Sequence, residues 1–233
     1  MAIEIEAPMR TIRELIEAIH LEATRAEFPV DTPVYDRAEK DPTMPILFAG
    51  SLDAATCVFG RDLGRDEVAA GEPLVGAGGR LVRAGVYEAK FGEPPAKSDK
   101  RVEAALNEVL LTNTVPYKPP GNKAYAKAVK ERFRPFVAEL LTVHWKGTKV
   151  ISLGNEAFEW FAPYANPDQA AALWAREDRY EGELACTLTA VVSSKVYTKA
   201  ITLCPLPHPS PLNARWYGAF PGLLAKRLAG DRA

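Results

Sequence analysis

Three polar side chains in this 233-residue sequence have the chemistry needed to break a bond between a sugar and a planar base. Asp62, Asn113 and His208 each stand just past an apolar, strand-like run. A carboxylate can orient water and stabilise a cationic sugar, and an imidazole can stabilise negative charge on a departing base. An amide can both accept and donate along one edge of that base. These residue types are what N-glycosidic hydrolysis of a pyrimidine would require.

The imidazole opens a stiff loop, His208-Pro209-Ser210-Pro211-Leu212-Asn213. Its two prolines fix φ and restrict the residues before them to extended backbone, so the imidazole, hydroxyl and apolar side chains are held in a fixed relation. Taken alone, the loop is equally compatible with a plain strand-to-helix turn and an incidental histidine. Asp62 alone would more often be a helix cap or turn residue, and Asn113 alone an Asx turn.

The elements that must position these residues alternate between helical and strand-like patterns, which favours an α/β sheet layered between helices. Ligands of such sheets bind at the carboxyl ends of the parallel strands, so we expect the three loops that carry the polar residues to converge. The expected strands are residues 54–59, 107–111 and 149–153, with 184–192 and 195–203 as a hairpin around Ser193-Ser194. The main helices are expected at 11–26, 80–90 and 124–144, and residues 28–45 are expected to be an irregular surface linker.

Length and composition predict a single domain over residues 1–233, because 47% of the residues are hydrophobic and can bury a full core. Cys57, Cys186 and Cys204 are odd in number and lie in strand-like runs, which predicts buried free thiols in a reducing, cytoplasmic compartment. We expect a monomer without a signal peptide in residues 1–10 and without a membrane-spanning segment.

The net charge of −1 gives no global sign of a nucleic-acid partner. Basic residues nevertheless gather in the segments 118–134 and 195–232, whereas the first 41 residues are acidic. A polarised surface of this kind could track phosphates. Before any motif is considered, ordinary solvated helix faces explain the same pattern better.

Four segments together resemble the uracil-DNA glycosylase superfamily, over residues 54–228. His208 to Asn213 resembles its second signature, His-Pro-Ser-Pro-Leu with a small polar residue, and residues 60–64 resemble its first, Gly-x-(Asp/Ala/Asn)-Pro-(Tyr/Gly). Residues 71–78 and 111–122 are similar to intervening segments of the iron–sulfur bacterial and archaeal members. The resemblance implies a three-layer α/β/α fold with a central, mostly parallel, roughly four-stranded sheet. It also implies a DNA repair enzyme that flips uracil out of DNA and hydrolyses its N-glycosidic bond, leaving an abasic site.

The resemblance implies a role for each matching residue. Asp62 would position the attacking water and offset the oxocarbenium charge, Asn113 would read the uracil edge, and His208 would donate to the uracil oxygen. Leu212 would wedge into the base stack as the nucleotide is flipped. Further substrate contacts would come from Gly60, Arg61, Gly64 and Leu74, and DNA contacts from Lys118, Lys123, Ser210, Pro211 and Arg215.

Several positions depart from the family pattern. Leu63 replaces the proline of the first signature, and Arg61 stands where the iron–sulfur members carry an acidic residue. Leu74 replaces a phenylalanine that stacks on uracil, and Gly64 replaces a tyrosine that excludes the thymine methyl in some members. The paired cluster cysteines are missing and Tyr117 stands where another ligand would fall. Because a cluster needs four thiolates, we predict no iron–sulfur cluster, no metal and no other cofactor.

Two further functions stay open at this point. A protein of the same fold could bind uracil-containing or abasic DNA with little turnover, because the first signature is altered. A glycosylase for another deaminated base is the third possibility.

Overall fold

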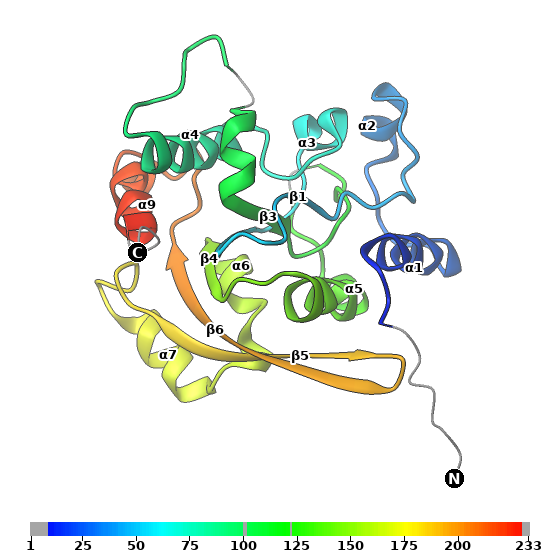
Figure 1. Ribbon diagram of the computed structural model, residues 1–233. Coiled ribbons are helices and arrows are strands. Elements are labelled where there is room, and N and C mark those ends of the chain that lie inside the picture. Colours follow the sequence, from blue (N-terminus) through cyan, green and yellow to red (C-terminus); the bar gives the residue numbers. More distant parts are fainter. Residues whose placement is uncertain (1–8, 100–101, 122, 230–233) are drawn as a thin grey trace.

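The computed structural model describes residues 9–99, 102–121 and 123–229, and these fold around a mixed sheet (Figure 1). The described residues contain six sheet strands in the order β1-β3-β2-β4-β6-β5. The four central strands run parallel, and β1 and β5 pair antiparallel at the two edges. The sheet is therefore mostly parallel as predicted, but its two edge strands make it wider than the expected four. The bounds are β1 (Phe48–Gly50), β2 (Thr56–Gly60), β3 (Val109–Asn113), β4 (Lys149–Leu153), β5 (Leu184–Val192) and β6 (Lys195–Leu206).

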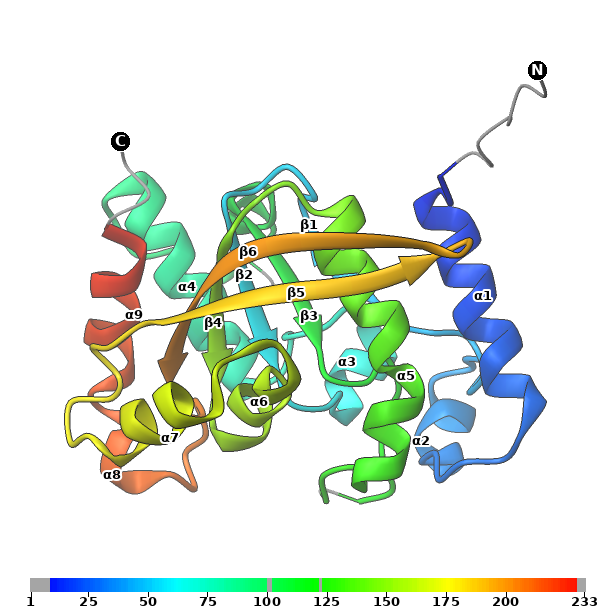
Figure 2. The same ribbon diagram turned by 90° about the horizontal axis from the view of Figure 1, so that it is seen from below.

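Helices cover both faces of the sheet, which confirms the three-layer α/β/α fold (Figures 1 and 2). The strand side chains alternate between two apolar clusters, so that Cys57 and Phe59 pack on one face and Val58 on the other. The first face is covered by α1 (Ile12–Arg25), α5 (Lys127–Glu139), α6 (Asn155–Glu159) and α7 (Pro167–Ala175). The second is covered by α4 (Ala77–Phe91), the 3-10 helix η1 (Glu103–Glu108) and α9 (Phe220–Leu228).

Three predicted boundaries need correction. The strand expected at 54–59 is β2, which starts at Thr56 and ends at Gly60. The strand expected at 107–111 starts only at Val109, because residues 103–108 form η1. Asn113 is thus the last residue of β3, whereas it was expected just past the end of the strand. The helix expected at 124–144 begins at Lys127, runs through the exposed Pro135 without a break, and ends in the π-helical turn η2 (Leu140–His144).

Residues 28–45 are not the irregular surface linker that the prolines and aspartates predicted. They contain α2 (Thr32–Arg37), whose Val34 and Tyr35 pack against Val68 of α3 (Arg65–Ala70). The ring centroid of Phe28 lies 5.1 Å from that of Tyr117 and 5.1 Å from that of Phe133, within the aromatic core. These contacts with residues distant in the sequence make residues 28–45 a packed part of the fold.

The predicted hairpin around Ser193 and Ser194 is confirmed. Both serines have positive φ, which gives the turn the twist that a two-residue hairpin connection needs. Figure 2 shows the hairpin as a long arm, and β5 packs along α5. Among the described residues, every helix is too short or too polar to cross a bilayer. Residues 1–8, which hold most of the segment expected to lack a signal peptide, lie outside the described part.

Candidate active site

A cavity of about 560 Å³ lies at the carboxyl ends of the four parallel strands. Asp62, Asn113 and His208 all line it, so the predicted convergence of three separate loops is confirmed. Thr114, just past β3, links its loop to the loop after β2, because its backbone N–H donates to the carbonyls of Gly60 (3.1 Å) and Arg61 (3.0 Å). The wall also includes Asp31, Val34, Gly60, Arg61, Leu63, Gly64, Arg65, Asp66, Glu67, Leu74, Gly76, Ala77, Gly78, Gly79, Lys118, Pro119, Gly121, Leu153, Pro209, Ser210 and Pro211.

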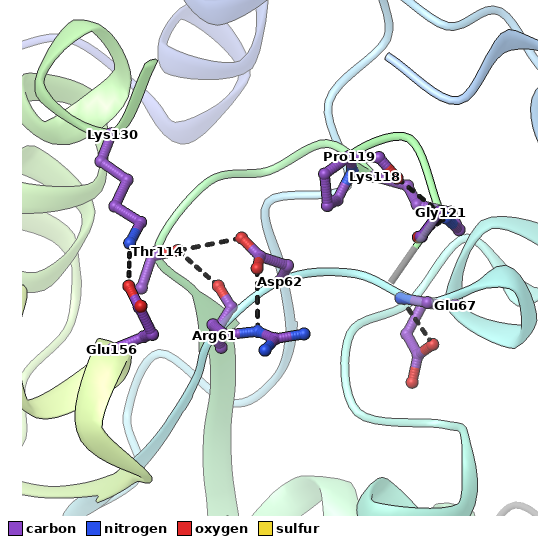
Figure 3. Close-up of polar contacts among 10 residues, drawn as sticks. Arg61, Asp62, Glu67, Thr114, Lys118, Pro119, Gly121, Lys130 and Glu156 are labelled. Atoms are coloured by element: carbon purple, nitrogen blue, oxygen red, sulfur yellow. Dashed lines mark hydrogen bonds and ion pairs between the residues drawn. The ribbon is translucent and has the colours of Figure 1, made fainter. Parts of the chain in front are cut away.

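The carboxylate of Asp62 is almost fully buried, with 2% of its side chain exposed. Its Oδ2 lies 2.9 Å from Nε of Arg61, and the hydroxyl of Thr114 makes a long contact of 3.5 Å with Oδ1 (Figure 3). Burial raises the pKa of Asp62, whereas the positive charges of Arg61 and Lys130 act in the opposite direction. Asp62 is therefore a desolvated carboxylate next to a fixed cation.

A second ion pair lies near this carboxylate. Lys130 of α5 pairs with Glu156 of α6, and Figure 3 shows the pair beside Thr114. Lys130 lowers the pKa of Asp62 and Glu156 raises it, so the two effects partly cancel. Sequence reasoning missed this pair, because nothing local marks two helix residues 26 positions apart as neighbours.

The amide of Asn113 is buried against the first loop. A Cβ added at Gly60 would lie 2.6 Å from Nδ2 of Asn113 and 3.3 Å from a methyl group of Leu74, so only glycine allows this approach. Within the described residues, Oδ1 of Asn113 has no hydrogen-bond partner. Because buried acceptors are normally paired, this oxygen is available to a ligand. Amide, glycine and leucine together form one wall of the cavity.

His208 stands at the mouth of the cavity, at the start of a loop held by its own backbone. The His208 carbonyl accepts from the Ser210 N–H (2.9 Å) and from the side-chain amide of Asn213 (3.2 Å). Behind the ring, Gly154 has a φ of +84°, and a Cβ added there would lie 3.0 Å from the His208 Cβ. Desolvation lowers the pKa of His208, and the charge of Arg61 lowers it further.

Glu67 is a site residue that the sequence analysis did not single out. Its buried carboxylate accepts backbone N–H groups from Gly64 (2.9 Å), Val75 (3.0 Å) and Gly76 (2.7 Å). It therefore joins the loop after β2 to the segment that carries Leu74. The available signal was its position three residues after the N-cap of α3, where glutamate commonly bonds back to the cap.

Replacing Glu67 with alanine is expected to lower the free energy of unfolding by about 1–3 kcal/mol, because three backbone donors lose their acceptor. Urea denaturation followed by circular dichroism measures this change. Asp66→Ala is the matched control, since Asp66 occupies the same helical turn and contacts Arg65 at a largely exposed site. Equal stabilities of the two variants would show that Glu67 does not tie the loops together.

The structure corrects the prediction that Lys118 contacts phosphate. The lysine is 3% exposed, and its ammonium donates to Asp31 (2.7 Å) and to the carbonyls of Pro119 (2.9 Å) and Gly121 (2.7 Å). Figure 3 shows this cation folded back onto its own loop. Lys118 thus fastens the loop after β3 to the segment before α2.

Of the other residues predicted to contact DNA, Ser210 and Pro211 line the cavity, and Leu212, Lys123 and Arg215 are exposed. Leu212 is 96% exposed, beside the exposed Pro211 and the half-buried Ser210. Lys123 is exposed, and the guanidinium of Arg215 lies 5.1 Å from the Trp216 ring centroid, on the short helix α8 (Ala214–Tyr217). An isolated leucine at the tip of a stiff loop is suited to insertion between stacked bases.

The cysteines do not fit an iron–sulfur cluster. Cys57, Cys186 and Cys204 are buried free thiols on β2, β5 and β6, as predicted from their strand-like surroundings. Burial raises the pKa of Cys186 and of Cys204 to about 11, which opposes the thiolate form that a cluster needs. Tyr117, at the remaining ligand position that the resemblance suggests, instead donates to the carbonyl of Thr43 (2.8 Å). Nowhere in the described ranges do three His, Cys, Asp or Glu side chains gather as a metal site.

Comparison with known proteins agrees with this geometry. The family model described as the uracil DNA glycosylase superfamily matches residues 48–229, a range that contains every strand and the residues of both signature loops. No curated protein matches the chain. The matched range covers most of the sequence and includes the ends of β2, β3 and β6, where the residues that line the cavity lie. The chain therefore belongs to the uracil-DNA glycosylase superfamily.

Proposed function

We propose that this protein removes uracil from DNA by hydrolysing its N-glycosidic bond, leaving an abasic site. The observation that carries the proposal is the meeting of Asp62, Asn113 and His208 in one cavity. A carboxylate, an amide and an imidazole at one place can act on both sides of the scissile bond. A volume of about 560 Å³ is large enough for an extruded nucleotide.

Asn113 recognises the base in this proposal. Its unpaired Oδ1 accepts an N–H from the base edge, while Nδ2 donates to the adjacent carbonyl oxygen. Leu74 covers one face of the base without aromatic stacking. A base that lacks this donor and acceptor pattern leaves the buried amide unsatisfied, which is the source of selectivity.

Asp62 and His208 divide the chemistry. Ionised Asp62 orients the attacking water and offsets the positive charge that develops on the sugar. Neutral His208 donates its ring N–H to the uracil oxygen that becomes anionic as the bond breaks. Thr114 supports the reaction indirectly, because it holds the backbone that carries Asp62.

DNA is the proposed partner of the exposed rim around the cavity. Lys123 and Arg215 contact phosphates, Ser210 and Pro211 lie along the strand, and Leu212 fills the gap that the flipped nucleotide leaves. We also propose that the protein acts as a monomer in the cytoplasm, associated with the nucleoid when bound to DNA. It needs no cofactor, because its cysteines fit no cluster and water is the only co-reactant.

Leu212→Ala is expected to slow uracil removal from duplex DNA about tenfold and to leave removal from single strands unchanged, because only the duplex must be unstacked. Single-turnover rates on matched single- and double-stranded oligonucleotides measure the difference. Leu21→Ala, at a leucine of α1 that is 54% exposed, is the control. An equal loss on both substrates would exclude the wedge role.

The function itself is tested with an oligonucleotide that contains one uracil, incubated with the protein and then treated with alkali. Scission at the uracil position shows a glycosylase. A retarded band without scission shows instead a binding protein of the same fold. An unmodified strand is the negative control, and thymine in a G·T mismatch is tested as a further candidate substrate.

A second candidate is a glycosylase for another deaminated base. It is favoured by Gly64 and Leu74, which line the cavity without the bulk of an aromatic ring. The same assay with hypoxanthine and xanthine decides between the two. Preferred scission at a purine lesion would replace uracil as the substrate.

A further inference from the structure

Arg61 contacts one ionisable group of the proposed reaction, Asp62, and lines the same cavity as another, His208. Its Nε is 2.9 Å from Oδ2 of Asp62, and its side chain lines the same cavity as His208. About a third of the side chain (32%) is exposed, which places it at the border between protein and cavity. Because a guanidinium stays protonated throughout the working range of a protein, it supplies a fixed positive charge.

We propose that Arg61 is a positioning residue that keeps Asp62 ionised and His208 neutral during catalysis, an inference that rests on the proposed function. The carboxylate offsets the charge of the sugar only when it is ionised. An imidazolium in the same cavity would neutralise that carboxylate. A fixed cation favours both required states, because it attracts an anion and repels a second cation.

Among the groups around Asp62, Arg61 contributes most to keeping the carboxylate ionised. Burial is the largest influence on the Asp62 pKa and raises it, and Arg61 is the strongest of the groups that lower it. Lys130 of α5 acts in the same direction more weakly, and Glu156 of α6 opposes it. The Thr114 hydroxyl adds the smallest effect, through its long contact with Oδ1.

The surroundings of His208 point the same way. After desolvation, Arg61 is the charged group that lowers the pKa of His208. The other charged residues on the cavity wall interact with one another or with backbone. Asp31 pairs with Lys118, Arg65 pairs with Asp66, and Glu67 accepts three backbone amides. The phenol of Tyr125, near Asp62, is buried and neutral.

Arg61→Gln tests the inference through the pH dependence of single-turnover uracil removal. Loss of the guanidinium removes a lowering influence on both groups, so the acidic limb of the profile moves to higher pH. We expect the rate at pH 6, relative to the plateau, to fall about tenfold compared with wild type. Arg61→Lys keeps the positive charge, so the acidic limb of its pH profile should lie close to that of the wild type. A loss that is uniform across pH would contradict the inference.

A second measurement needs no catalysis. The chain has three histidines, so His208 can be assigned by the resonance that disappears in His208→Asn, and then titrated by NMR. Its titration should move to higher pH in Arg61→Gln and return toward wild type in Arg61→Lys. An unchanged titration would overturn the inference. If the wild type removes no uracil, the proposed function fails, while this titration still decides the role of Arg61.

Discussion

Asp62→Asn is expected to lower the single-turnover rate of uracil removal by about 10²–10⁴-fold. The amide keeps the shape of the carboxylate, but it neither activates water nor offsets a cationic sugar. Affinity for a uracil-containing oligonucleotide, measured by fluorescence anisotropy, should stay within about threefold, because the DNA rim is unchanged. Undiminished turnover would remove Asp62 from its proposed role.

The fold of this variant should be intact, which separates catalysis from stability. Burial raises the pKa of Asp62, so ionising it at neutral pH costs folding free energy that is absent at low pH, where the carboxyl is protonated. A neutral amide removes this cost. Urea denaturation at pH 7 should therefore show equal or greater stability for Asp62→Asn, although the ion pair with Arg61 is lost.

His208→Ala is expected to lower the rate of uracil removal by about 10²–10³-fold, because the donor to the departing base is lost. The loss should appear in the rate of the chemical step at saturating protein, with little change in DNA affinity. His20→Ala is the matched control, since His20 lies on α1 and contacts the carbonyl of Thr43. A comparable loss in both variants would indicate general damage rather than a catalytic role.

The site could be predicted to the extent that local pattern determines it. The polar residues at the ends of apolar, strand-like runs predicted where the cavity lies, because parallel strands in one sheet end at the same edge. The serine turn of the hairpin was also predicted from the sequence. Each of these features depends on residues close together in the chain.

The features that sequence reasoning missed depend on distant residues. Lys118 was expected at phosphate because it is basic and lies in the segment 111–122 that resembles the family, yet its partner Asp31 is 87 positions away. The strand β1 has only three residues and is defined by its pairing with β3. Residues 28–45 have the composition of a loop, and the aromatic neighbours of Phe28 bring them into the core.

Asn113 is paired with Gly60 in the ladder between β3 and β2, so the residue proposed to read the base has its backbone in the centre of the sheet. Leu212, the residue proposed to enter the DNA, is by contrast almost wholly surrounded by solvent. The entropy of ordering the backbone at Asn113 is thus lost when the chain folds and not when a base arrives. In the proposed function, the base therefore meets an amide on a backbone that is already ordered, whereas an exposed side chain on a stiff loop enters the DNA.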